Sequence, residues 1–72
     1  MQYRITAKYD PDFYRPIEAK LAIIEGLNGR LQYVSVNPRE RIIKIITADK
    51  NLANEISERI RNLEGMIEPS EL

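Results

Sequence analysis

The acidic residues Asp10 and Asp12 are the side chains best placed to do chemistry, because neighbouring carboxylates can bind a hard cation through oxygen. A calcium loop needs further carboxylates at fixed spacing and a glycine, and the surrounding stretch YDPDFYRP has neither. The chain also contains no histidine and no cysteine, the usual general base, soft-metal ligand and thiol nucleophile. We therefore interpret Asp10 as a turn residue and Asp12 as a helix N-cap, and we expect no enzyme activity, no metal site and no cofactor.

Two other short segments could contact a ligand. The stretch GLNG, Gly26 to Gly29, matches the loop of KH domains, but that loop opens a helix and this one precedes the strand-like RLQYVSV. We interpret it as the end of a helix followed by a turn. The aromatic residues Tyr9, Phe13 and Tyr14 could line a pocket or stack on a base, but aromatics beside a helix start more often pack into the core, which we expect here.

The composition describes one small globular domain. With 72 residues, 43 % hydrophobic and 31 % charged, we expect a single domain over 1–68 and a loose tail over 69–72. Eleven basic and eleven acidic residues cancel, which argues against a strong electrostatic nucleic-acid binder but allows a local basic patch. No apolar run is long enough for a membrane span and the N-terminus has a strand pattern, so we expect a cytoplasmic protein without membrane contact.

Hydrophobic periodicity places the first strand and the first helix. Alternation over 3–9 predicts a half-buried strand. A helix is predicted near 13–27, with Pro16 in its first turn and Gly26 at its end. The predicted apolar face of this helix consists of Ile17, Leu21, Ile24 and Leu27.

The stretch QYVSVNPRERIIKII predicts a β-hairpin, with Asn37-Pro38-Arg39-Glu40 as its turn. A tight turn there places Val34 opposite Ile43 and Leu31 opposite Ile46. A second helix is predicted near 50–64 with Asp49 as its N-cap, and a short strand follows within 66–69. The apolar stripe of that helix is predicted to be Leu52, Ile56, Ile60 and Leu63, with Glu55 and Arg59 paired on the wet side.

The order strand, helix, strand, strand, helix, strand predicts an α+β fold, the ferredoxin-like βαββαβ sandwich with two helices on one face of an antiparallel sheet. From IEAKLAIIEGLNGRLQYVSVN through RIIKII to the second helix, roughly two thirds of the chain resembles the heavy-metal-associated domain. That family carries two metal-binding cysteines before its first helix, where this chain has YDPDFYRP, so its metal binding is not implied here. The topology also resembles ACT domains and the ligand-binding domains of Lrp-type regulators, which implies small-ligand sensing of an amino-acid type as a third possible function.

The hairpin leaves apolar side chains on both faces of the sheet, although a domain of this size has one core. We expect a non-catalytic interaction module that self-associates or binds another protein through the uncovered face, because an exposed apolar patch marks interfaces. The alternative is a single-stranded nucleic-acid-binding module on the same face, using Tyr33 and basic side chains. The predicted interface residues are Leu31, Tyr33, Ile42, Lys44 and Ile46, and the possible nucleic-acid contacts are Arg4, Lys8, Arg39 and Arg41 together with Lys44.

Overall fold

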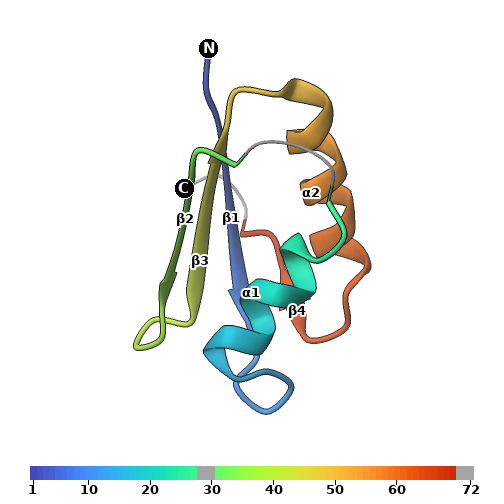
Figure 1. Cartoon of the computed structure of the whole chain (residues 1–72). Helices are drawn as coiled ribbons and strands as arrows, with labels where there is room; N and C mark the ends of the chain where they lie inside the picture. Colours follow the sequence, from blue (N-terminus) through green and yellow to red (C-terminus); the bar gives the residue numbers. More distant parts are fainter. Residues whose placement is uncertain (28–30, 70–72) are drawn as a thin grey trace.

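The computed structural model describes residues 1–27 and 31–69, which form one four-stranded antiparallel sheet with two helices against one face (Figure 1). The elements are β1 (Tyr3–Tyr9), α1 (Pro16–Ile24), β2 (Tyr33–Asn37), β3 (Ile42–Thr47), α2 (Lys50–Asn62) and β4 (Met66–Ile67). The strand order β2-β3-β1-β4 makes β3 and β1 central. This confirms the predicted ferredoxin-like sandwich. Of the predicted tail over 69–72, all but the first residue lies outside the described residues. Within the described ranges, no helix has the length and apolar character needed to cross a membrane.

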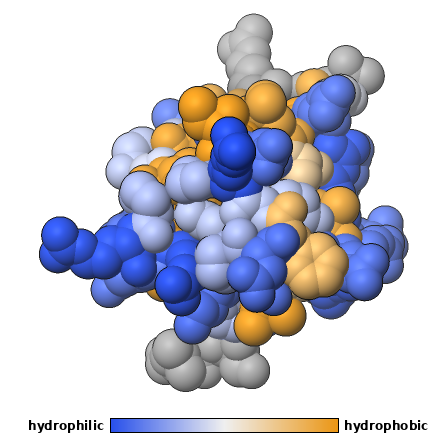
Figure 2. All heavy atoms as spheres, turned by 90° about the horizontal axis from the view of Figure 1, so that it is seen from below, coloured by the Kyte–Doolittle hydropathy of each residue, from blue (hydrophilic) through white to orange (hydrophobic). Residues whose placement is uncertain are grey.

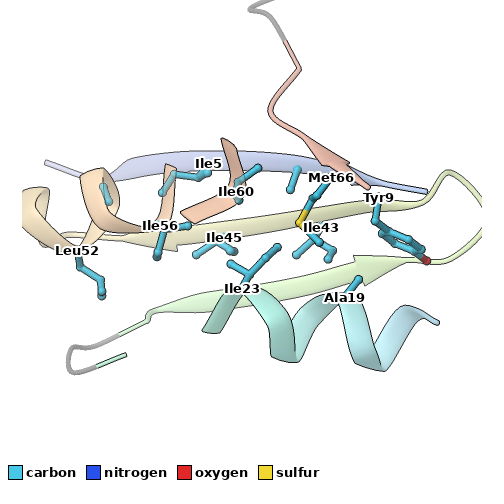
Figure 3. Packing of buried hydrophobic residues seen from close by; sticks show 12 residues of the cluster. Ile5, Tyr9, Ala19, Ile23, Ile43, Ile45, Leu52, Ile56, Ile60 and Met66 are labelled. Carbon is cyan, nitrogen blue, oxygen red and sulfur yellow. The ribbon is translucent and has the colours of Figure 1, made fainter. Parts of the chain in front are cut away.

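The core lies between the sheet and the helices, where the inward side chains of β1 and β3 meet α2 and α1 (Figure 3). The predicted stripe of α2 is confirmed, since its first three members are buried and Leu63 packs at the edge. Asp49 caps α2 as predicted, because its carboxylate accepts hydrogen bonds from the backbone N–H groups of Asn51 and Leu52 at 2.9 and 3.2 Å. The buried apolar residues are Ile5, Ala7, Tyr9, Ala19, Ile23, Ile43, Ile45, Leu52, Ala53, Ile56, Ile60 and Met66.

The predicted apolar face of α1 is wrong in its first half, although Ile24 and Leu27 do pack against the core. Ile17 is 71 % exposed and Leu21 is 49 % exposed, whereas Ala19 and Ile23 are completely buried. The sequence PIEAKLAII is apolar on almost every side of the helix, so periodicity does not select the face that packs. The small side chain of Ala19 lets the helix approach the sheet closely, and Ile23, one turn later on the same face, fills the core.

Helix α1 starts later than predicted, and its N-cap is Arg15 rather than Asp12. The backbone N–H of Arg15 donates to the carboxylate of Glu18 at 2.9 Å, and Pro16 occupies the first turn as predicted. The carboxylate of Asp10 instead closes a turn by accepting the backbone N–H of Asp12 at 2.9 Å.

The end of α1 is held by an arginine from α2. Gly26 adopts a φ of 76°, as expected for a residue that ends a helix. The guanidinium of Arg59 donates to the backbone carbonyl oxygen of Ile23 at 3.1 Å and also to that of Glu25. The predicted pairing of Glu55 with Arg59 is therefore wrong, because the carbonyl groups at a helix C-terminus carry partial negative charge and lack partners within the helix.

The predicted hairpin register is also wrong, by two residues. Val34 lies opposite Ile45, and Tyr33 rather than Leu31 lies opposite Ile46. Because side chains alternate with a period of two, this shift leaves every side chain of the strands on its predicted face.

A longer loop causes the shift. Residues 38–41 form a four-residue connection in place of a tight turn, and Asn37 pairs with Ile42 at its base. The side-chain oxygen of Asn37 accepts the backbone N–H groups of Arg39 and Glu40 at 3.0 and 3.1 Å. Arg41 completes the loop with a φ of 61°, a left-handed conformation that its sequence does not signal.

Candidate functional site

The face of the sheet opposite the helices, here called the open face, is organised into three rows by the strand register. Residues directly opposite each other on neighbouring strands project to the same side, so each row is a set of neighbouring side chains. From β2 to β4, the rows are Tyr33–Ile46–Arg4, Ser35–Lys44–Thr6 and Asn37–Ile42–Lys8–Ile67.

The structure brings together four of the five predicted interface residues. Tyr33 is 50 % exposed and Lys44 is exposed, whereas Ile42 and Ile46 are half-buried. Leu31 does not belong to the open face, because it precedes β2 and packs against the core.

The apolar side chains of the open face form two separate groups. Tyr33 and Ile46 lie in the first row, Ile42 and Ile67 lie in the third, and the polar row around Lys44 separates them. The end of the molecule with the β2–β3 and β1–α1 loops, which is the lower end in Figure 1, also shows apolar side chains at separate places among hydrophilic ones (Figure 2). The centre of an ordinary protein–protein interface is apolar, whereas the centre of this face is polar. This arrangement favours a narrow, elongated ligand over the broad surface of a folded protein.

Sequence reasoning missed Ile67, which is 60 % exposed and lies opposite Lys8 on the neighbouring strand. A signal was available, since Met66 and Ile67 are adjacent in a strand and must point to opposite faces. Met66 is buried, and Ile67 therefore extends the open face to the edge of the sheet.

The charged side chains in the three rows of the open face are all positive. Arg4, Lys8 and Lys44 are exposed there, and the described residues give none of them a hydrogen-bond or ion-pair partner. No carboxylate occurs among the side chains of the three rows. The zero net charge of the chain thus conceals a basic face, since the described acidic side chains lie on the helices, turns and loops.

The hairpin adds further positive charge beside the open face. Arg39 and Arg41 are both exposed in the loop at the end of β2 and β3. The intervening Glu40 accepts a hydrogen bond from the side-chain amide of Asn37 at 3.2 Å, which draws its carboxylate toward the base of the loop.

Two hollows lie along this basic surface. The first has a volume of about 220 Å³ and is lined by Arg4, Thr6, Tyr33, Lys44 and Ile46 with the backbone of β1 and β3. The second, about 360 Å³, lies at the other end of β1 and is lined by Lys8, Tyr9, Asp10, Pro11, Arg41, Gly65, Met66 and Ile67, so it includes one carboxylate. Each hollow combines two cationic side chains with an apolar wall, and the second also has Asp10, whose carboxylate accepts the backbone N–H of Asp12.

The other predicted candidates have structural roles. Tyr9 is buried in the core as expected, and the hydroxyl of Tyr14 donates to the backbone carbonyl of Glu64 at 2.7 Å. The expected packing of Phe13 into the core is wrong, because this ring is 51 % exposed and lies against Gly65. Among the described residues, no group of three or more acidic side chains is placed to hold a metal ion. The GLNG segment lies partly outside the described residues, so its comparison with a nucleic-acid-binding loop is not resolved by the structure.

A second apolar surface lies on the solvent side of α1 and is here called the α1 stripe, consisting of Phe13, Ile17 and Leu21. Ile17 and Leu21 are four positions apart on α1, Phe13 lies in the turn before the helix, and each of the three is about half exposed or more. The ring of Phe13 lies against Gly65, which fixes one end of the stripe to the α2–β4 connection.

Comparison with known proteins gives no relative for this chain: no protein-family model matches it, and no curated protein or solved structure does so either. The assignment of a function therefore depends on the geometry of the open face and of the α1 stripe.

Proposed function

We propose that the chain is a non-catalytic binding module that takes an anionic partner on the open face of its sheet. The observation that carries this proposal is the presence of Arg4, Lys8 and Lys44 on the two central strands with no carboxylate in their cross-strand rows, Asp10 being the nearest, at the edge of the second hollow. Exposed cations grouped on one surface attract a polyanion and raise its rate of association.

The central row supports binding rather than catalysis. Lys44 lies between the hydroxyls of Ser35 and Thr6, an arrangement that resembles a nucleophile beside a base. This lysine is exposed to water, where its ammonium group can attract an anion. We therefore assign the two hydroxyls to hydrogen bonding with a bound anion.

The same charges disfavour a symmetric homodimer built on the open face, which was the sequence-based expectation. A two-fold contact places the same patch of each copy against the other. Lys44 lies at the centre of the patch with Arg4 and Lys8 beside it, so two copies would bring like charges together in a desolvated interface. An acidic partner avoids this cost.

Self-association through the α1 stripe is a second candidate function, and its occupant is a second copy of the chain. Ile17, the most exposed residue of the stripe, has Glu18 on one flank and Lys20 on the other, because successive helix positions turn by 100°. Suppose that two copies pack their α1 helices side by side and parallel, related by a two-fold axis that is parallel to the helices. The Glu18 flank of each copy then lies beside the Lys20 flank of the other. The stripe is therefore self-complementary in charge, unlike the open face.

The experiment for the main proposal compares two charge reversals of equal size. Lys44→Glu alters the centre of the open face, and Lys50→Glu makes the same change at the exposed start of α2. The binding of each variant to fluorescent poly-L-glutamate and to a single-stranded oligonucleotide is measured at 50 and 200 mM salt, about the range over which phosphate contacts weaken. Loss of binding in the Lys44 variant alone supports the proposal, and equal binding by both variants, or none by the wild type, contradicts it.

A further inference from the structure

We propose that the anionic partner is single-stranded nucleic acid and that the hollow lined by Tyr33, Arg4 and Lys44 holds one unstacked base with its neighbouring phosphates. This inference rests on the proposed function, because it names the chemistry of the partner for the same face.

The hollow supplies the two components that single-strand recognition needs. Tyr33 presents a half-exposed ring on β2, and its row places Ile46 beside it and Arg4 beyond. Bases stack on exposed aromatic rings while basic side chains follow the phosphates. An acidic polypeptide could pair with the cationic side chains, but Asp and Glu have no aromatic ring that could stack on Tyr33, whereas every nucleotide carries a base.

The size and position of the two hollows favour an extended strand. At about 220 Å³, the first is smaller than the roughly 300–1,000 Å³ of sites for whole small molecules, and it suits a single flat group. Arg4 and Lys8 are four residues apart on β1, a separation of about 13 Å at 3.3 Å per residue. A flexible polyanion can therefore contact Arg4 and Lys44 at one hollow and Lys8 and Arg41 at the other.

The middle row provides a polar path between these two ends. Ser35 and Thr6 flank Lys44 and can donate hydrogen bonds to phosphate or sugar oxygens without adding bulk. A duplex would present its phosphates to this path, but its bases remain stacked and cannot lie on Tyr33. The arrangement thus predicts a preference for single strands over duplex.

The test measures fluorescence anisotropy of single-stranded DNA, single-stranded RNA, duplex DNA of equal length and poly-L-glutamate at two salt concentrations. Three variants separate stacking from charge: Tyr33→Leu removes the ring, Tyr33→Phe keeps it, and Phe13→Leu removes an equally exposed ring on the helical side. We expect Tyr33→Leu to weaken single-strand binding by at least about fivefold, since one stacked base contributes about that much or more. Tyr33→Phe and Phe13→Leu should bind as the wild type does.

Ultraviolet cross-linking of the wild type gives a second readout that does not depend on a variant folding. The cross-linked peptide should contain Tyr33, and a cross-link confined to other peptides overturns the inference. Equal affinity for poly-L-glutamate and single strands, or for duplex and single strands, also overturns it while leaving the proposed anion-binding face intact. Failure of every polyanion to bind contradicts both proposals.

Discussion

Arg59 of α2 donates a hydrogen bond to the backbone carbonyl of Ile23 in α1, 3.1 Å away, and so joins the two helices at the point where α1 ends. The same guanidinium reaches the carbonyl of Glu25, so one side chain satisfies two carbonyl groups that the helix leaves without partners. This contact fixes the end of α1 over the core, and with it the face that α1 turns to the solvent.

Removal of this arginine should destabilise the domain. We expect Arg59→Ala to lower the free energy of unfolding by about 1.5–3 kcal/mol, because it deletes charge-assisted hydrogen bonds to two carbonyls. Arg61→Ala is the matched control, since its exposed ion pair with Glu68 should contribute at most about 1 kcal/mol. Urea unfolding of both variants checks this, and equal effects would show that the Arg59 contacts add nothing.

The two described glycines with positive φ should respond differently to alanine. Gly26→Ala should cost about 1–2 kcal/mol, because φ is 76° but nothing lies within 4 Å of an added Cβ. Gly65→Ala should cost more, since its Cβ would lie 2.5 Å from Cγ of Phe13. Thermal unfolding measures both.

A double-mutant cycle isolates the clash at Gly65. Adding Phe13→Ala should make Gly65→Ala less costly than it is in the wild type, because the ring that meets the new Cβ is gone. Additive effects of the two substitutions would mean that only the backbone conformation at Gly65 matters.

Charge substitution on α1 tests self-association through the α1 stripe. Sedimentation velocity should show a wild-type species larger than a monomer and a monomeric Ile17→Lys variant, because a buried lysine at the centre of the stripe opposes the contact. Ile67→Lys is the control, since Ile67 is similarly exposed but lies on β4 outside the stripe. A monomeric wild type, or dispersal by both substitutions, would reject the stripe as the contact.

The salt dependence of oligonucleotide binding reports the phosphate contacts of Lys8. We expect Lys8→Ala to reduce the slope of log affinity against log salt by about one, the change for one lost phosphate contact. Lys50→Ala, on the helical side, should leave the slope unchanged. An unchanged slope for Lys8→Ala would mean that the second hollow takes no phosphate.

The parts of the fold that sequence predicts well are those with one clear pattern. Alternation along β1 and a single apolar stripe on α2 leave one way to bury each element, and both predictions are confirmed. The face of α1 has no such signal, because Ile17 and Ile23 are equally apolar and packing around the small Ala19 decides between them.

The open face was predictable in outline for the same reason. Strand periodicity assigns Arg4, Lys8 and Lys44 to one side whatever the hairpin register, so the basic character of that face follows from the sequence. The pairing of side chains between β2 and β3 does not follow. It depends on a loop whose length is set by Arg41 in a left-handed conformation, which only glycine or asparagine would have signalled.

The separation of charge between the two sides of the sheet also governs how this domain meets a partner. With eleven positive and eleven negative residues it exerts little long-range attraction as a whole, but it carries a dipole directed across the sheet. A nearby polyanion exerts a torque on the domain that turns its basic side toward the polyanion, and screening confines this effect to within about 8–10 Å at physiological salt. On the proposed function, the domain becomes oriented only when it is close to its anionic partner.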